Sequence, residues 1–109
     1  MPLHAVARRG DPSTSWAAAN SLYPETLRRT LRLVLHTIQD RGPMTDEHLV
    51  DLLEGAMSPS GARSRRAELV DLGLVYDTGQ RLVLRSGRRA IVWAARWMSP
   101  EPLPLWGQL

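Results

Sequence analysis

The sequence of 109 residues contains no cysteine, no lysine and no phenylalanine. Without cysteine the chain forms neither a disulfide nor a metal site built on thiolates, which suits a cytoplasmic protein. No stretch is as long and apolar as a membrane-spanning helix requires, and the first residues lack the apolar core of a secretory signal. We therefore expect a cytoplasmic protein with no membrane partner.

The sequence patterns of common catalytic sites are also missing. There is no Gly-rich phosphate loop, no Gly-x-Ser-x-Gly motif and no cysteine nucleophile. The three histidines, His4, His36 and His48, do not share a metal-ligand spacing. Acid pairs such as Asp46 and Glu47 are ordinary in the first turn of a helix. We therefore expect neither an enzyme nor a bound metal or other cofactor.

All 14 basic residues are arginine, which indicates the coding bias of a high-GC genome. The net charge of +3 is spread unevenly along the chain. Positions 58–99 hold eight arginines against three acids, whereas the other positions hold six arginines against eight acids. A basic C-terminal half predicts a polyanionic partner at one face. The alternative is that arginine simply fills exposed positions in such a genome.

A first helix is predicted over residues 24–41 by apolar side chains that recur at helical spacing. Pro24 suits the first turn of this helix, and Gly42 suits its end. The arginines of the segment are expected to lie mostly off the apolar stripe. The stripe consists of Leu27, Leu31, Val34, Leu35 and Ile38, and the arginines are Arg28, Arg29 and Arg32.

Two shorter helices are predicted next, and a tight turn joins them. Thr45 is a natural N-cap for a helix that carries four acids and no arginine and ends at Gly55. The next helix starts with Ser58 as its cap and Pro59 at its first position. Gly73 then provides the C-terminal stop.

The pattern changes from a helical to a strand period after the third helix. Segments 74–84 and 89–97 are rich in β-branched and aromatic residues, and Ser86-Gly87 forms the turn between them. The Asp77-Thr78-Gly79 segment indicates a bulge or a second turn. Together these elements predict a mainly α fold with a C-terminal β-hairpin, in the α+β class.

The predicted elements make one domain over residues 14–98. A short helix around Trp16 is expected to dock this side chain on the domain. Residues 1–13 are expected to form a flexible N-terminal arm, because they show no period. Residues 99–109 are rich in proline and predict an extended tail that carries Trp106.

The order of helix, helix, tight turn, helix and hairpin is the layout of a winged helix-turn-helix. The segment "SRRAELVDLGLV" resembles the junction between recognition helix and wing in MarR-like proteins, where Gly-Leu-Val follows a leucine by four residues. The segment "GPMTDEHLVDLL" resembles the short strand and second helix of that fold. Together with "TSWAAA" and "SGRRAIVW", the span is similar to small helix-turn-helix proteins encoded by phages of high-GC bacteria. The resemblance covers roughly residues 14–97.

This resemblance implies sequence-specific binding of double-stranded DNA by a transcriptional regulator of phage type. The helix over 58–72 would enter the major groove, and the basic wing tip over 85–89 would lie on the backbone or in the minor groove. MarR-like proteins usually dimerise through long terminal helices, which this chain lacks. Helix 24–41 and the Trp106 tail are the surfaces left for a homodimer.

The alternative function is a winged-helix module that binds a protein of the transcription or replication machinery. The acidic second helix and the tail with Trp106 favour this alternative. Trp93 and Trp97 are expected in the core or at an interface rather than as platforms for stacked bases. The alternative stays open at this stage because a winged-helix fold does not fix a function.

A helical wheel separates the candidate DNA contacts of the third helix from its packing residues. With Leu69 taken as inward, Ala62 falls beside it, and Arg65 and Arg66 fall on the flanks or the inward side. Arg66 stands where the MarR-like pattern usually has an apolar residue, so we expect it to pair with an acid of the preceding helix. The open face consists of Ser60, Arg63, Ser64, Ala67 and Asp71.

The predicted wing tip adds three arginines to the candidate contacts of the third helix. Guanidinium groups bind phosphate oxygens and guanine edges, and the N-terminal end of a helix favours phosphate as well. Arg65 is kept among the candidates as a flanking residue. The residues predicted to contact DNA are Ser60, Arg63, Ser64, Arg65, Arg85, Arg88 and Arg89.

Overall fold

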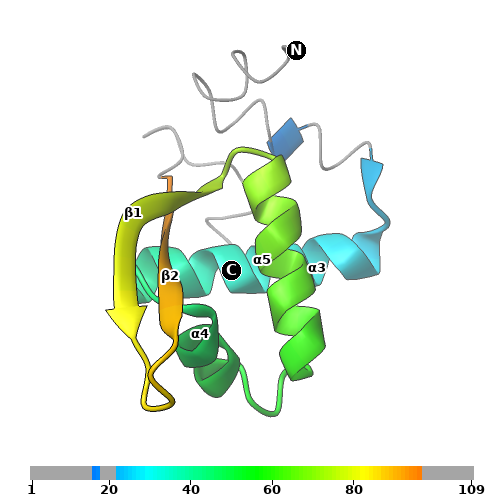
Figure 1. Cartoon of the computed structure of the whole chain (residues 1–109). Coiled ribbons are helices and arrows are strands. Elements are labelled where there is room, and N and C mark those ends of the chain that lie inside the picture. Colours follow the sequence, from blue (N-terminus) through cyan, green and yellow to red (C-terminus); the bar gives the residue numbers. More distant parts are fainter. Residues whose placement is uncertain (1–15, 18–21, 97–109) are drawn as a thin grey trace.

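Three helices precede an antiparallel β-hairpin in the computed structural model, which describes residues 16–17 and 22–96 (Figure 1). The described part of the chain is therefore an α+β fold, as the sequence predicted, with a layout compatible with a winged helix. The helices are α3 (Glu25–Arg41), α4 (Asp46–Leu52) and α5 (Pro59–Asp71), and the strands are β1 (Val75–Val83) and β2 (Arg89–Ala95).

The longest of these helices, α3, crosses behind α5 and supplies much of the core (Figure 1). It begins directly after Pro24 and ends at Gly42, whose N–H donates to the Ile38 carbonyl at 2.9 Å. Gly42 has a φ of 95°, a conformation that glycine adopts without a steric cost. The predicted stripe is confirmed, since Leu31, Val34, Leu35 and Ile38 are buried and Leu27 is partly buried.

One arginine of α3 contradicts the expectation that its arginines lie mostly off the stripe. Arg32 is only 7% exposed, because its position borders that of Leu35 on the helix and its long stem packs against the domain. Its guanidinium lies 3.6 Å from the carboxylate of Glu25, which Arg28 and Arg29 also reach, at 2.6 and 3.8 Å. The hydrogen bond from Arg28 holds the pKa of the Glu25 carboxyl below its usual value.

The two predicted N-caps are confirmed. The Thr45 hydroxyl accepts a hydrogen bond from the His48 N–H at 3.2 Å, and the Ser58 hydroxyl accepts one from the Gly61 N–H at 3.0 Å. α4 is shorter than expected, because it ends at Leu52 and Gly55 lies in the turn that follows. The connection between α4 and α5 is therefore longer than the tight turn that the sequence predicted, and it spans residues 53–58.

The hairpin has the predicted turn and a bulge in its first strand. Gly87 has a φ of 91° in the turn, and its N–H donates to the Leu84 carbonyl at 2.8 Å. The pairing register shifts between Asp77 and Arg81, where Gly79 has a φ of 88°. The Asp77 carboxylate accepts bonds from the Arg81 guanidinium and the Gly79 N–H, and these bonds hold the pKa of Asp77 below its usual value. The segment is therefore a bulge rather than a second turn.

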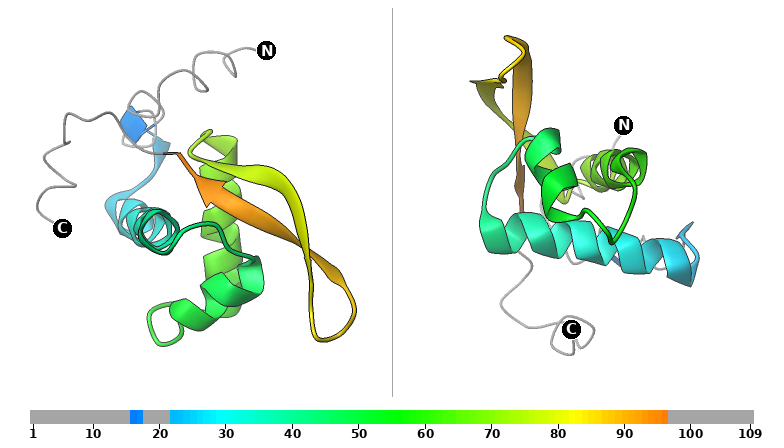
Figure 2. Two further views of the ribbon diagram at one scale, coloured as in Figure 1. Left: turned by 90° about the vertical axis from the view of Figure 1, so that its left-hand side faces the viewer. Right: turned by 90° about the horizontal axis from the view of Figure 1, so that it is seen from below.

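A short backbone bridge joins the hairpin to the segment before α4. Met44, just before α4, pairs with Trp93 in β2 through two backbone hydrogen bonds of 2.9 and 2.8 Å. The short strand that the sequence predicted before α4 is thus reduced to a single bridge. From this bridge the hairpin projects beyond α4 and α5, on the side away from α3 (Figure 2). The projecting end carries the turn residues, so it is available to a partner.

Trp16 belongs to the hydrophobic core, so its predicted docking on the domain is confirmed. Most of the short helix predicted around it lies outside the described residues, as do the arm over 1–13, Trp97 and the tail over 99–109 with Trp106. In the part of the chain that the structure describes, none of the helices is long and apolar enough to cross a membrane.

Substitutions at two leucines of α3 test the position of the core. Leu35 is fully buried, whereas Leu33 on the same helix is 40% exposed. We expect Leu35→Ala to lower the free energy of unfolding by about 2–5 kcal/mol through lost burial and the cavity left behind. Leu33→Ala is expected to lower it by less than about 1 kcal/mol. Urea denaturation measures both values, and equal losses would contradict the assigned core face.

Candidate nucleic-acid interface

The open face predicted for the third helix is the exposed face of α5. Ala62 and Leu69 are fully buried, as the helical wheel required. The small side chains at the N-terminal end of this face leave space around the arginine between them, and Ser60 lies 3.4 Å from the hydroxyl of the capping Ser58. The exposed residues are Ser60, Arg63, Ser64, Ala67 and Asp71.

Arg66 points away from the exposed face and forms the predicted pair with an acid of α4. Its Nε donates to Asp46 Oδ1 at 2.9 Å, and its Nη2 donates to Asp46 Oδ2 at 2.7 Å. The two side chains are only 16% and 19% exposed. Two parallel hydrogen bonds between a guanidinium and a carboxylate are among the stronger polar contacts in proteins, so the position of Arg66 is well defined.

An aromatic ring completes this arrangement. The guanidinium carbon of Arg66 lies 4.1 Å from the centroid of the Trp93 ring, within the range of a cation–π contact. Asp46 belongs to α4, Arg66 to α5 and Trp93 to β2, so the three residues, which we call the Arg66 cluster, connect three elements. The backbone of Trp93 also bonds to Met44, two residues before Asp46. The hairpin is therefore held beside the helices by both its backbone and a side chain.

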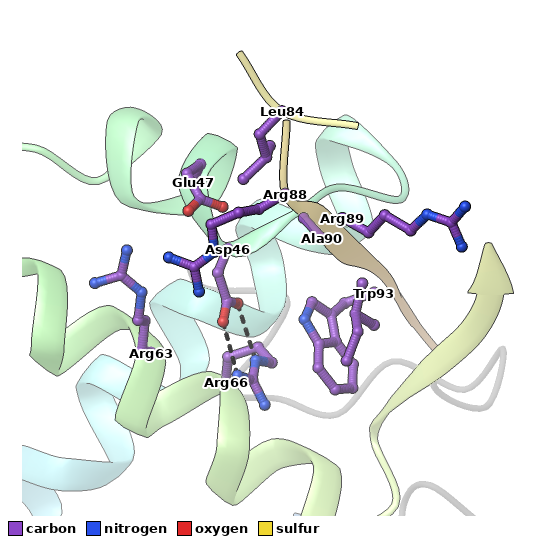
Figure 3. A pocket seen from close by; sticks show the side chains of 10 residues that line it. Asp46, Glu47, Arg63, Arg66, Leu84, Arg88, Arg89, Ala90 and Trp93 are labelled. Atoms are coloured by element: carbon purple, nitrogen blue, oxygen red, sulfur yellow. Dashed lines mark hydrogen bonds and ion pairs between the residues drawn. The ribbon is translucent and has the colours of Figure 1, made fainter. Parts of the chain in front are cut away.

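A groove lies between α5 and the hairpin, and the Arg66 cluster contributes to its lining (Figure 3). It encloses about 240 Å³ and is more polar than apolar. Four arginines and two carboxylates line it, which leaves a formal charge of +2. The lining residues of this α5–hairpin groove are Asp46, Glu47, Arg63, Arg66, Leu84, Arg88, Arg89, Ala90, Ile91 and Trp93.

Two arginines from different elements extend into this groove. Figure 3 shows the guanidinium of Arg63, from α5, and that of Arg88, from the hairpin, in the space on the Asp46 side, whereas Arg89 extends the opposite way. Arg85 lies exposed in the turn. Within the described residues, none of these four arginines has a carboxylate within ion-pair distance. Their charges are therefore available to an anionic partner.

Arg65 is placed differently from the other predicted contacts. Its guanidinium donates to both carboxylate oxygens of Glu68, at 2.6 and 3.1 Å, and it does not line the α5–hairpin groove. Burial raises the pKa of the nearby Tyr23 phenol, the charges of Glu68 and Asp71 raise it further, and the charge of Arg65 opposes them. Arg65 thus lies on the flank of α5 that faces Tyr23, and the structure does not bring it together with Arg63.

Of the ten residues that line the groove, only Arg63, Arg88 and Arg89 were predicted DNA contacts, and Trp93 and Glu47 are among the seven that were not. Trp93 was expected in the core or at an interface, and its contact with Arg66 depends on the hairpin register, which the sequence does not display. Glu47 was interpreted only as a residue of the first turn of α4, yet its carboxylate lines the groove. The sequence did hold a signal for Glu47. It directly follows Asp46, one of the acids expected to pair with Arg66, so it was bound to lie near the same surface.

The groove does not have the composition of a metal site. Among the residues described, no group of three or more His, Cys, Asp or Glu side chains is placed to hold a metal ion. Its excess of guanidinium groups suits an anion, since these groups donate hydrogen bonds and cannot accept them. The chemistry of the lining thus selects a negatively charged ligand with oxygen acceptors.

The chain was also compared with known proteins. No protein-family model, curated protein or solved structure matches it. The similarity to MarR-like and phage-encoded helix-turn-helix proteins accordingly stays an interpretation of the sequence.

The Arg66 cluster predicts different roles for two adjacent arginines. Arg66→Ala removes two hydrogen bonds and a ring contact and leaves Asp46 without its partner, so we expect a loss of about 1–3 kcal/mol in the free energy of unfolding. Arg65→Ala removes an ion pair within one helix and is expected to cost about 0.5 kcal/mol. Thermal and urea denaturation compare the two variants. An Arg66→Ala variant as stable as the parent would show that the cluster does not hold the fold.

Proposed function

We propose that this chain binds double-stranded DNA as a winged helix-turn-helix protein, with α5 in the major groove and the hairpin as the wing. The observation that carries the proposal is the distribution of unpaired positive charge in the described part of the chain. Arg63, Arg85, Arg88 and Arg89 lack an acidic partner, and all four lie on the open face of α5 or at the projecting end of the hairpin. The sugar–phosphate backbone is the polyanion that fits such a surface.

The dimensions and composition of α5 agree with entry into a major groove. An α-helix with its side chains is about 10–12 Å wide, and the major groove is about 12 Å wide. Around Arg63 the open face carries the small residues Ser60, Ser64 and Ala67, which allow the helix to approach base edges closely. Arg63 can then donate two hydrogen bonds to a guanine or hold a phosphate. Base contacts made by this face would provide the sequence specificity of the protein, whereas a phosphate contact would position the helix.

The hairpin would supply contacts outside the major groove. Its end projects from the body of the domain and carries Arg85, Arg88 and Arg89 at or beside the turn (Figure 2). Contacts of this kind with the backbone or in the minor groove fix the register of the protein on DNA. Arg65 is retained as a flanking candidate, although its pairing with Glu68 has to be broken or shared before it binds a phosphate.

The biological role that fits this proposal is that of a small transcriptional regulator of phage type, acting on DNA in the bacterial cytoplasm. Such a protein needs no metal or other cofactor, because its binding energy comes from phosphate and base contacts. A homodimer would bind two half-sites about one helical turn apart, whereas a monomer would bind a single short site. The length of the DNA segment that it protects therefore distinguishes these two modes.

A second candidate function is binding of a protein, and it is favoured by the opposite side of the hairpin. A groove of about 450 Å³ lies there, with an apolar floor formed by Met44 and Val92 and with the acids Glu47 and Asp51 at its edge. Leu82 also lines it and is 54% exposed. An apolar segment with a basic residue would fit this groove. A protein that used only this surface would not bind DNA even at low salt.

A salt titration with duplex DNA of mixed sequence tests the proposed function. We expect the affinity to fall as salt rises, with a slope of about −0.9 in log K against log salt for each phosphate contacted. Arg63→Ala and Arg88→Ala are each expected to weaken binding by about fivefold to tenfold. Arg41→Ala is the control, because Arg41 is an exposed arginine at the end of α3, away from the α5–hairpin groove. No binding at low salt, or equal losses in all three variants, would contradict the proposal.

Charge removal at Glu47 gives a prediction of opposite sign. The Glu47 carboxylate lines the groove without an ion pair in the described part of the chain, so it repels a bound phosphate. We expect Glu47→Gln to tighten binding to the same duplex by about twofold to fivefold at low salt, with a smaller gain at high salt. Glu54→Gln, an exposed acid outside the groove, is the control and should change affinity little. Weaker binding by Glu47→Gln would show that phosphate does not enter the groove.

A further inference from the structure

We propose that Arg63 and Arg88 bind one and the same phosphate group of a DNA strand, held in the α5–hairpin groove. This inference rests on the proposed function and specifies which part of the DNA the groove takes. A site of this kind would recognise a phosphodiester group rather than a base. The two arginines come from α5 and from the hairpin, so the phosphate would connect the two elements that surround the groove.

The side chains of Arg63 and Arg88 converge on one groove. Both line the same groove of about 240 Å³, and their guanidinium groups extend into the same space (Figure 3). Neither has a carboxylate within ion-pair distance in the described part of the chain, whereas Arg65 and Arg66 on the same helix are each held by one. Two like charges that face one space repel each other, and an anion between them adds two attractions at shorter distances that outweigh this repulsion.

The wall of the groove is held in place by Arg66. Its guanidinium donates two hydrogen bonds to Asp46 and packs on the Trp93 ring, so these contacts would have to break before Arg66 could bind the anion itself. In the same pair the charge of Asp46 is neutralised, which removes most of its repulsion toward a phosphate. Of the two acids in the lining, only Glu47 is left without an ion pair, and the groove keeps its positive charge.

The groove also suits a phosphate in size and in hydrogen-bonding groups. Its volume of about 240 Å³ leaves room for a phosphate group between the two arginines. A phosphodiester has two free oxygens, and each can accept hydrogen bonds from one planar guanidinium. Arg89 lines the groove but extends the opposite way, so it would contact a different part of the backbone.

The shared phosphate would determine how the protein sits on DNA. If one phosphate lies between Arg63 and Arg88, the strand to which it belongs passes between α5 and the hairpin. The distance from this phosphate to the base edges then sets which residues of α5 reach the bases, because phosphate contacts position a protein and base contacts specify its site. Ser60 and Ser64, on the same exposed face as Arg63, are the nearest candidates for these base contacts.

A double-mutant cycle on mixed-sequence duplex DNA tests the shared phosphate. The variants are Arg63→Ala, Arg88→Ala and the double substitution, with the affinity measured over a range of salt concentrations. If one phosphate is shared, the double variant should bind at most about twofold more weakly than the weaker single variant, because either substitution already disrupts the site. The slope of log K against log salt should be less steep in the double variant than in the parent protein, by about 0.9, the value for one phosphate. In the control cycle of Arg63 with Arg85, which lies outside the groove, the two effects should multiply.

The possible outcomes separate this inference from the proposed function. If the effects of Arg63→Ala and Arg88→Ala multiply and the salt slope becomes less steep by about 1.8, the two arginines bind separate phosphates. The shared site is then wrong, whereas DNA binding stands. If neither substitution weakens binding, both the shared site and the proposed interface are wrong. Both side chains are exposed, and neither has an acidic partner in the described residues, so the variants should keep the parent melting temperature.

A second measurement uses the unaltered protein with inorganic phosphate as the probe. The side-chain Nε–H signals of Arg63 and Arg88 are followed by NMR while phosphate is added. One shared site predicts that both signals shift with the same dissociation constant, and that Arg85 and Arg89 shift less. Different dissociation constants for Arg63 and Arg88, or shifts no larger than those of Arg85, would overturn the shared site without the use of any variant.

Discussion

The paired hydrogen bonds between Arg66 and Asp46, packed against the Trp93 ring, are the contact on which the other features of this domain depend. α5 and the hairpin meet mainly near their ends, at Leu74, and the hairpin is also held by its packing against α3 and by the bridge at Met44. The Arg66 cluster adds a side-chain connection at the middle of α5, and so fixes the width of the groove between helix and hairpin. The charged Arg66 side chain thereby positions the hairpin beside α5, and the carboxylate of Asp46 offsets the cost of burying that charge.

The pairing of charges also separates the arginines of the described chain into two groups. Those held by carboxylates, such as Arg65, Arg66 and Arg81, stabilise a helix, a junction or a strand. Arg63, Arg88 and Arg89, which have no carboxylate within ion-pair distance in the described residues, line the groove, and Arg85 lies in the hairpin turn beside it. The number of arginines in α5 therefore overstates the surface available to DNA. In the proposed function the hairpin compensates for this, because it brings further guanidinium groups to the same side of the domain.

The sequence was informative where the chemistry is local, and less so where it depends on distant contacts. The caps at Thr45 and Ser58 and the stops at Gly42 and Gly73 were predicted correctly, because they depend on neighbouring residues, whereas α4 ends three residues before the predicted Gly55. A helical wheel turned Arg66 toward the domain, and the acids of α4 were the available partners, although Asp46 lies 20 positions away. The burial of Arg32 was missed because a long stem can turn a charged residue at the edge of a stripe into a packing residue. The Trp93 contact could not be predicted, since it depends on a strand register that a bulge shifts. Arg65 was retained as a DNA contact although Glu68, three residues later, was a visible partner.

The central proposal is that DNA binds to the surface formed by α5 and the end of the hairpin. An NMR titration of the backbone amides with duplex DNA tests it most directly. The account predicts that the largest shifts fall in two segments, residues 60–64 and residues 85–89, while exposed residues of α3 such as Leu33 remain unchanged. Shifts concentrated around Leu82 and the exposed acids of α4, or no shifts at low salt, would contradict it.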